Sequence, residues 1–328
     1  MPEHRGPAFV DLQVNGFAGV DYNADASTEH IVQSFDAMER TGVGLCLPTI
    51  ITSTFEHFRN CARRLIATRH PIVAGLHMEG PYISPDDGYR GAHPRACVVA
   101  PSLDDFARRQ DAADGHIRLV TVAAEVPGVL PVIEGIAGSG VRVALGHTNA
   151  TGAQIADAVH AGATMSTHLG NGCPAILPRH PNVIWDQLAT DALHASLIVD
   201  GHHLPPATVR AMVRAKGVER CMLVTDAMMA AGAAPGIYRL GELEVIASPS
   251  GRVAAAGSLT LAGSALTMPR AVGYTYRWAA LDLVSAWAMA STLPAAYLGI
   301  TPRGEAQVVW NDDYSELTQV RFAPDITG

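Results

Sequence analysis

Two consecutive stretches decide the fold: residues 141–147, VRVALGH, and residues 163–168, ATMSTH. Each starts as a short apolar run and ends on a histidine, His147 in the first and His168 in the second. A histidine is a poor choice for the middle of an apolar strand, but at a strand end that opens onto a cleft it can face a metal or a substrate. The two stretches therefore predict neighbouring β-strands that end at a shared site.

Similar apolar runs recur along the chain, with helix-compatible segments between most of them. The predicted strands are residues 9–14, 42–50, 72–79, 117–125, 141–147, 163–168, 194–200 and 221–226. The clearest predicted helices, several of which begin at a capping Ser or Thr, are residues 28–40, 54–69, 104–113, 150–161, 205–216 and 264–278. Near-continuous apolar strands that alternate with helices are typical of a parallel sheet covered by helices. Eight such units predict a (β/α)8 TIM barrel.

The pattern changes after the eighth strand. Residues 236–257 are interpreted as two short hairpin strands inserted before the last helix, and residues 306–324 as two more strands. We therefore expect a barrel made of residues 8–235 and 258–300. The remaining residues, 1–7, 236–257 and 301–328, are expected to form a small β appendage beside it.

The composition is that of an ordinary enzyme and argues against nucleic-acid and membrane binding. The 328 residues are 48% hydrophobic and 16% charged, and the formal net charge is −8 with no run of Lys and Arg. No apolar run reaches the roughly 18 residues of a membrane helix, and the first residues lack the pattern of a signal peptide. The five cysteines are scattered without a CxxC pair, which indicates reduced thiols. We expect a cytoplasmic protein.

Glu79, His147, His168 and Asp226 each end a predicted strand. In a barrel these ends converge on one face, where catalysis normally takes place. One carboxylate and two imidazoles suit Zn²⁺ or Fe²⁺ and leave a position open for water, while an aspartate nearby can take up and return a proton. A single histidine is more often structural than a ligand, but four suitable residues on one rim favour a metal site.

Several motifs together resemble a known family, the N-acetylglucosamine-6-phosphate deacetylases of the amidohydrolase superfamily. The motifs run in order over residues 9–294 and are GLHMEGPYISPDDGYRGAHP, GHTNA, STHLGN, IVDGHH, LVTDA and LAGSALTM. The resemblance implies a metal-dependent hydrolase that removes the acetyl group from an N-acetylated amino sugar phosphate, such as N-acetylglucosamine-6-phosphate, and gives acetate and the amino sugar. It also implies one bound divalent metal ion, Zn²⁺ or Fe²⁺, and a homodimer.

The resemblance also implies roles for individual residues. Glu79, His147 and His168 would bind the metal, Asp226 would be the general acid and base, and His93 would polarise the acetyl carbonyl. Substrate contacts would come from residues on the loops that follow the sixth and seventh strands: Asn171, Gly172, Arg179 and His203. Of these, Arg179 matches a phosphate-binding arginine that often reaches into a neighbouring subunit, although it and His180 could equally be a solvated loop pair.

The chain departs from the family pattern in three places. Gln13 and Asn15 replace a His-x-His pair that holds a second metal in many amidohydrolases, and amides are poor ligands, so we expect one metal. The loop of residues 170–182 differs from its usual form, which leaves the substrate open. The family also has further strands before the equivalent of Phe9, so we expect the appendage to be a reduced β-sandwich.

Two other interpretations stay open. The protein could be an amidohydrolase of the same fold that acts on an unphosphorylated N-acyl amino sugar or another N-acyl amine. It could also be a sugar-binding protein that has lost catalysis, but a protein that only binds has no need of all four rim residues.

Overall fold

All eight predicted strands form in the computed structural model, which describes residues 1–240, 243–257, 261–314 and 316–324. They pair in the order β11-β10-β9-β8-β7-β6-β5-β2, and each neighbouring pair is parallel. The strands are Phe9–Val14 (β2), Val43–Ile51 (β5), Leu76–Glu79 (β6), Ile117–Val122 (β7), Arg142–Leu145 (β8), Ala163–Ser166 (β9), His194–Leu197 (β10) and Cys221–Leu223 (β11). This confirms the predicted barrel.

The barrel closes where the end of its first strand, β2, meets the segment that follows its last strand, β11. Val14 forms a parallel bridge with Ala227, and the amide of Asp226 donates to the carbonyl oxygen of Gln13 over 2.9 Å. Lower in the barrel, β2 and β11 do not bond to each other directly. The amides of Val10 and Leu223 donate instead to the carbonyl oxygens of Ala290 and Met289, over 2.8 Å each. The seam is therefore irregular, and other groups lie between the two strands.

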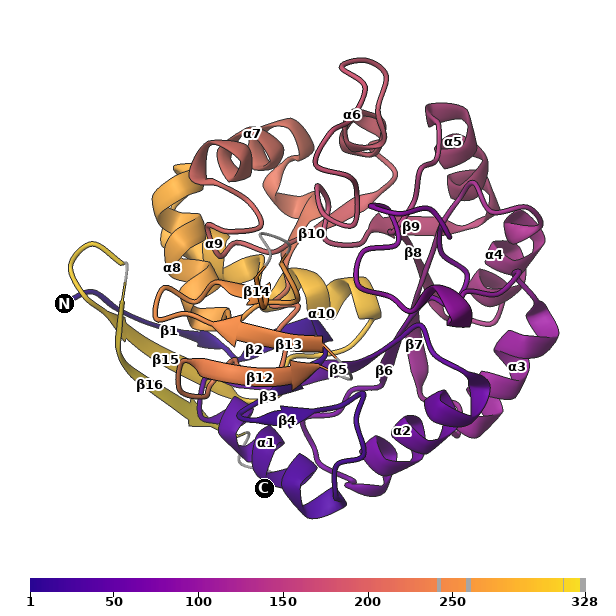
Figure 1. The fold of residues 1–328 in the computed structure, drawn as a ribbon. Coiled ribbons are helices and arrows are strands. Elements are labelled where there is room, and N and C mark those ends of the chain that lie inside the picture. Colours follow the sequence, from indigo (N-terminus) through magenta and orange to yellow (C-terminus); the bar gives the residue numbers. More distant parts are fainter. Residues whose placement is uncertain (241–242, 258–260, 315, 325–328) are drawn as a thin grey trace.

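Helices surround the barrel in the order of the chain, as Figure 1 shows. They are Thr28–Glu39 (α1), Phe55–Ala67 (α2), Leu103–Ala112 (α3), Val129–Gly138 (α4), Gly152–Ala161 (α5), Val183–Ala189 (α6), Pro206–Lys216 (α7) and Met268–Ala279 (α8), followed by Leu283–Ala288 (α9) and Thr292–Leu298 (α10). Two short 3-10 helices are Arg95–Cys97 (η1) and Val218–Arg220 (η2). Ser27, Thr54 and Ser102 cap α1, α2 and α3 through side-chain oxygens that accept backbone N–H groups. The sixth helix, α6, is short, with 7 residues.

The remaining strands form antiparallel sheets outside the barrel. One sheet contains Glu3–Pro7 (β1), Glu305–Trp310 (β15) and Leu317–Ala323 (β16); another contains Gly236–Leu240 (β12), Leu243–Ala247 (β13) and Val253–Ala255 (β14). A small pair, Gly16–Phe17 (β3) and Val20–Asp21 (β4), follows β2. The insert thus contains three strands and not the two expected from the sequence, because residues 253–255 also pair with β13.

The two three-stranded sheets share no strand pairing within the described residues, and their buried side chains belong to different apolar clusters. The β12–β14 sheet shares a small apolar core with Met228–Ala230, whereas buried residues of β15 belong to the main core. The predicted division into barrel and appendage stays a prediction, and residues 241–242, 258–260, 315 and 325–328 of its ranges lie outside the described residues.

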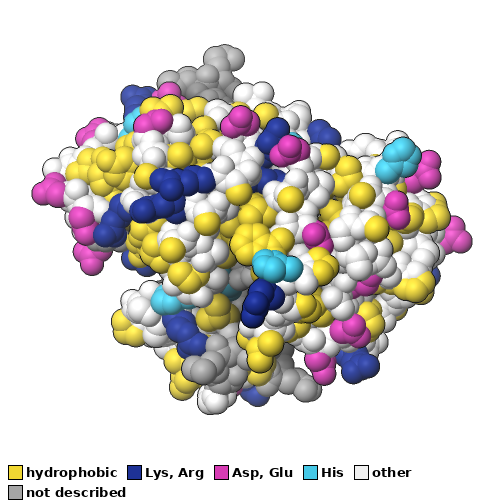
Figure 2. Space-filling view, turned by 90° about the horizontal axis from the view of Figure 1, so that it is seen from above, with side chains coloured by type: hydrophobic (Ala, Val, Ile, Leu, Met, Phe, Trp, Pro, Cys, Tyr) yellow, Lys and Arg dark blue, Asp and Glu magenta, His cyan; other side chains and the backbone are white. Residues whose placement is uncertain are grey.

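Two further observations concern the surface charge pattern and the length of the helices. On the face shown in Figure 2, basic, acidic and apolar side chains are interspersed. No helix within the described ranges combines the length and the apolarity that crossing a membrane requires.

Two tryptophans join the β1–β15–β16 sheet to the barrel. Trp310 of β15 is fully buried, and its Nε1–H donates to the carbonyl oxygen of Pro269 over 3.2 Å. Trp287 of α9 lies edge-on to Trp310, with ring centroids 6.3 Å apart, and its Nε1–H donates to Pro7 over 2.9 Å. The outer sheet is therefore anchored through the main core.

Replacing Trp310 with Ala is expected to lower the free energy of unfolding by about 3–5 kcal/mol, because a large buried side chain leaves a cavity. Urea denaturation followed by circular dichroism measures this. Trp185 is 53% exposed, so Trp185→Ala is the matched control and should change the free energy of unfolding by less than about 0.5 kcal/mol. Equal stabilities for the two variants would contradict the anchoring role.

Candidate metal centre and active site

The four rim residues meet at one cavity. Glu79 ends β6, while His147, His168 and Asp226 lie just beyond the ends of β8, β9 and β11. All four line a cavity of about 650 Å³ at the C-terminal end of the barrel. The structure therefore brings together side chains from four separate strand ends, at the face where TIM barrels hold their active sites.

Glu79, His147 and His168 form a compact cluster. The Oε1 atom of Glu79 lies 3.1 Å from His168 Nε2 and 3.3 Å from His147 Nε2, and the two nitrogens are 3.1 Å apart. All three side chains are buried. Burial alone would raise the pKa of Glu79, but its bonds with His147 and His168 hold that pKa well below its ordinary value.

The spacing and chemistry of this cluster fit a metal ion. Ligand atoms about 2.0–2.1 Å from a tetrahedral Zn²⁺ are about 3.3 Å apart, which is close to the observed separations. The Nδ1–H of His147 donates to the carbonyl oxygen of Tyr89 over 2.9 Å, which leaves the lone pair of Nε2 free for a ligand bond. Gln13 donates from Nε2 to Glu79 Oε1 over 2.9 Å, so its amide nitrogen supports the carboxylate and points no lone pair at the cluster.

Asp226 faces the same cavity with a different environment. Asn15 donates from Nδ2 to Asp226 Oδ1 over 2.7 Å. Burial and the charge of Glu79 raise the pKa of Asp226 to about 6, which is closer to neutrality than that of an ordinary aspartate. A carboxyl group with such a pKa can accept a proton and return it near neutral pH.

His93 completes the inner wall of the cavity. Its Nε2 lies 3.7 Å from Glu79 Oε2, and its ring centroid is 4.3 Å from that of His147. The amide N–H of Thr52 donates to His93 Nδ1 over 3.4 Å, and Thr52 Oγ1 lies 2.8 Å from the same nitrogen. Burial and the neighbouring His147 lower the pKa of His93 to about 3, so its ring is neutral. With Nδ1 accepting, the ring carries its proton on Nε2.

Three of these strand ends have a strained backbone. His147, His168 and Asp226 have φ angles of 50°, 31° and 46°, in the left-handed region that residues other than glycine rarely adopt. Gly172 is required beside them, since a Cβ on it would come within 3.0 Å of His147 Nδ1 and 3.1 Å of His168 Cε1. The loop after β9 is thus packed directly on the two histidine rings.

The predicted substrate residues divide into two groups. Asn171, Gly172 and His203 line the cavity. His203 is held by Asp200, whose Oδ2 lies 2.6 Å from His203 Nδ1. Arg179, in contrast, is exposed and is not among the residues that line the cavity of its own chain.

Sequence reasoning missed several residues around the cavity. Asp200 follows β10, so its place at a strand end could have identified it. Thr52 follows β5 in the same way. Leu240, an apolar wall of the cavity, lies in the β12–β14 insert, and no motif indicates that the insert reaches the barrel mouth. Leu261, a second apolar wall, begins the LAGSALTM motif, but the motif is not predicted to lie at the cavity.

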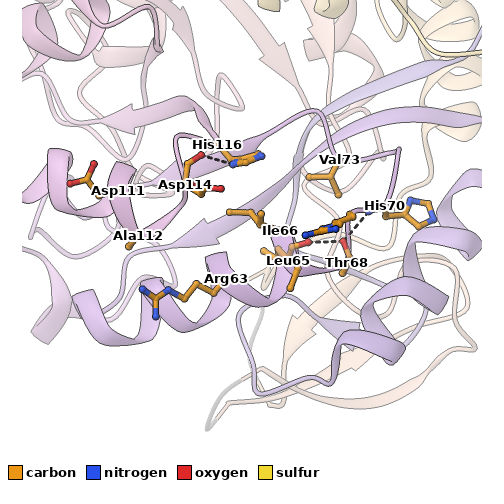
Figure 3. A pocket seen from close by; sticks show the side chains of 12 residues that line it. Arg63, Leu65, Ile66, Thr68, His70, Val73, Asp111, Ala112, Asp114 and His116 are labelled. Atoms are coloured by element: carbon orange, nitrogen blue, oxygen red, sulfur yellow. Dashed lines mark hydrogen bonds between the residues drawn. The ribbon is translucent and has the colours of Figure 1, made fainter.

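A second cavity of about 660 Å³ lies away from the C-terminal ends of the barrel strands, beside the C-terminal ends of α2 and α3 (Figure 3). Its polar groups include His116, whose Nδ1 lies 2.8 Å from the carbonyl oxygen of Asp114. His70 also belongs to a possible ligand cluster with Asp36 and Glu39, but Glu39 pairs with Arg303 and Asp36 is exposed. The candidate site is therefore the cavity at the strand ends.

Comparisons with known proteins agree with this geometry. No family model matches the chain. The N-acetylgalactosamine-6-phosphate deacetylase of Shewanella sp. (strain ANA-3) is 34% identical over 330 residues, which cover 97% of this chain and 82% of that protein. The N-acetylglucosamine-6-phosphate deacetylase of Lysinibacillus sphaericus is 34% identical over 304 residues, which cover 91% and 77%.

A solved structure is similar over the same length. It is a variant of the N-acetyl-D-glucosamine-6-phosphate deacetylase of Mycobacterium smegmatis in complex with N-acetyl-D-glucosamine-6-phosphate. The two folds superpose with a TM-score of 0.87 at 30% sequence identity, covering 97% of this chain and 85% of that one. The chain therefore belongs to the family of N-acetylglucosamine-6-phosphate and N-acetylgalactosamine-6-phosphate deacetylases, within the amidohydrolase superfamily.

Proposed function

We propose that this protein hydrolyses the acetamide group of an N-acetylated amino sugar phosphate, such as N-acetylglucosamine-6-phosphate, to acetate and the amino sugar phosphate. The observation that carries the proposal is the buried cluster of Glu79, His147 and His168 beside Asp226, in a chain 34% identical to deacetylases of this kind.

Glu79, His147 and His168 would hold one divalent metal, Zn²⁺ or Fe²⁺. Such a metal supplies Lewis-acid chemistry: it lowers the pKa of water to about 7 in favourable sites and polarises a carbonyl group. The amide nitrogen of Gln13 already donates to Glu79, which supports one metal and not two.

Asp226 and His93 would carry the steps that belong to the protein. Asp226 takes a proton from the attacking water as the new C–O bond forms at the acetyl carbon. His93 donates a hydrogen bond from Nε2 to the oxygen that becomes negative. Asp226 then passes its proton to the amine nitrogen as the C–N bond breaks. The pKa of about 6 at Asp226 suits both halves of this cycle.

Substrate binding would use Asn171, Gly172 and His203 within the cavity. Because Arg179 lies outside the cavity of its own chain, we propose that it contacts the phosphate of a substrate bound to a second copy, in a homodimer. A cytoplasmic location is also proposed, supported by five cysteines that form no disulfide.

A different amide substrate is the second candidate. The residues identified as lining the cavity include no Lys or Arg, so within one chain the cavity favours a substrate without a phosphate. An unphosphorylated N-acyl amino sugar or another N-acyl amine would meet this condition.

Replacing His168 with Ala is expected to abolish metal binding, because one of three ligands is lost. Elemental analysis of protein loaded with Zn²⁺ or Fe²⁺ measures the metal content. The control is His160→Ala, at an exposed position on α5, which should retain about one metal per chain, as a single-metal site requires. Full metal content in the His168 variant would rule out the proposed ligand set.

Replacing Asp226 with Asn should lower kcat by about 10²–10⁴-fold, since the amide cannot carry the proton, and should leave the metal content unchanged. Acetate release from N-acetylglucosamine-6-phosphate, per metal-loaded chain, measures this. Retention of wild-type turnover would show that another group acts as the base.

Acetate release should be faster from the 6-phosphates of N-acetylglucosamine or N-acetylgalactosamine than from the free sugars. Arg179→Ala should lower kcat/KM for the phosphates by about 10–100-fold, the value of a hydrogen bond to a charged group, and leave the free sugars unaffected. Arg214→Ala, at an exposed position on α7, is the control. Equal rates on phosphorylated and free sugars would favour the second candidate.

A further inference from the structure

Asp11 is a buried carboxylate that the proposed chemistry does not use. It lies within β2, two residues before Gln13, and only 1% of its surface is exposed. Burial raises the pKa of Asp11 to about 7, even though hydrogen bonds from Thr225 and Gln13 oppose the shift. A carboxyl group in such a position is costly, so its hydrogen-bond partners indicate what it does there.

At the barrel seam, where β2 and β11 do not pair directly, the side chain of Asp11 accepts hydrogen bonds from both sides. At the lower end, the amides of Val10 and Leu223 bond to the segment between α9 and α10. Two residues beyond the end of β11, the amide of Thr225 donates to Asp11 Oδ1 over 3.2 Å and not to a backbone carbonyl of β2. The amide of Gln13 donates to the same oxygen over 3.2 Å. A side chain thus joins the two strands where their backbones do not.

The second carboxylate oxygen acts through the hydroxyl of Thr225. That hydroxyl donates to Asp11 Oδ2, and its oxygen accepts the amide N–H of Ala227 over 3.2 Å. Thr225 and Ala227 are the two neighbours of Asp226, whose φ of 46° is unfavourable for an aspartate. The residues on both sides of the strained position are therefore tied to one carboxylate.

We propose that Asp11 is a positioning residue, which acts through the Thr225 hydroxyl to hold the backbone of Asp226 in the conformation that directs its carboxylate to Asn15 and the cavity. The same carboxylate fixes the amide of Gln13, whose side chain donates to Glu79. This inference rests on the proposed function of Asp226 as the proton carrier.

The test uses two substitutions that break the same link. In Asp11→Asn, the side chain keeps its shape but cannot accept from the Thr225 hydroxyl and both amides together. In Thr225→Val, the shape and the β-branch are kept and the hydroxyl is lost. Thr225→Ser is the matched control, because it keeps the hydroxyl and loses only a methyl group.

Asp11→Asn and Thr225→Val should each lower kcat by about 10–100-fold, the effect of a small misplacement of a reacting group, while KM and metal content stay near wild type. Thr225→Ser should retain most of kcat. The double variant should be no slower than the slower single variant, because both changes remove one shared connection.

All rates are taken per folded, metal-loaded chain, and thermal denaturation is measured in parallel. A lower melting temperature with unchanged kcat in both single variants, or fully additive losses in the double variant, would overturn the positioning role. Crystal structures of the two single variants give a readout that does not depend on activity: the φ of Asp226 and its bond with Asn15 should change. If both remain as in the wild type, the inference is wrong.

These outcomes are separable from a failure of the proposed function. Wild-type protein that releases no acetate from any of the four sugars would refute the proposed reaction, while the Asp226 backbone in the variants would still decide whether Asp11 holds it.

Discussion

The site depends on one buried negative charge, the carboxylate of Glu79. A charge taken out of water is costly unless donors and opposite charges surround it. Gln13 donates to its Oε1, and the Nε2 atoms of His147 and His168 lie within 3.3 Å of the same oxygen. These partners come from β2 and from the ends of β8 and β9, so satisfying the charge aligns separate parts of the barrel rim. The two imidazoles provide part of this compensation, and a divalent cation bound beside them would complete it.

The barrel was predictable because its signal is distributed along the whole chain. Eight apolar runs, each too short to be decisive, alternate with helices at spacings that only a parallel sheet satisfies. The clustering of Glu79, His147 and His168 followed from the same signal, since all three stand where runs end, while their role as metal ligands stays a prediction. The third strand of the insert was missed because VAA at residues 253–255 is too short and too rich in alanine to indicate a strand.

The supporting contacts could not be predicted, because each joins residues that are far apart in sequence. Gln13 and Asn15 stand out only as replacements for histidines, and their bonds to Glu79 and Asp226 depend on how the barrel closes. Asp11 looks like a polar interruption of an apolar strand until the irregular seam is known. The position of Arg179 depends on a loop with an unusual sequence, so the resemblance gave its proposed role but not its place outside the cavity.

The lining of the cavity comes from two parts of the chain, the barrel and the insert between its last strand and the helix that follows. The floor, with the titratable groups, belongs to strand ends fixed by the barrel. Part of the wall, including Leu240, belongs to a sheet that packs on Met228 and Met229 through its own small core. Substitutions of Leu240 can therefore reshape the opening from a strand that carries none of the titratable groups that line the cavity. Within such a scaffold, the shape of the cavity mouth and the titratable cluster on its floor are set by separate segments of the chain.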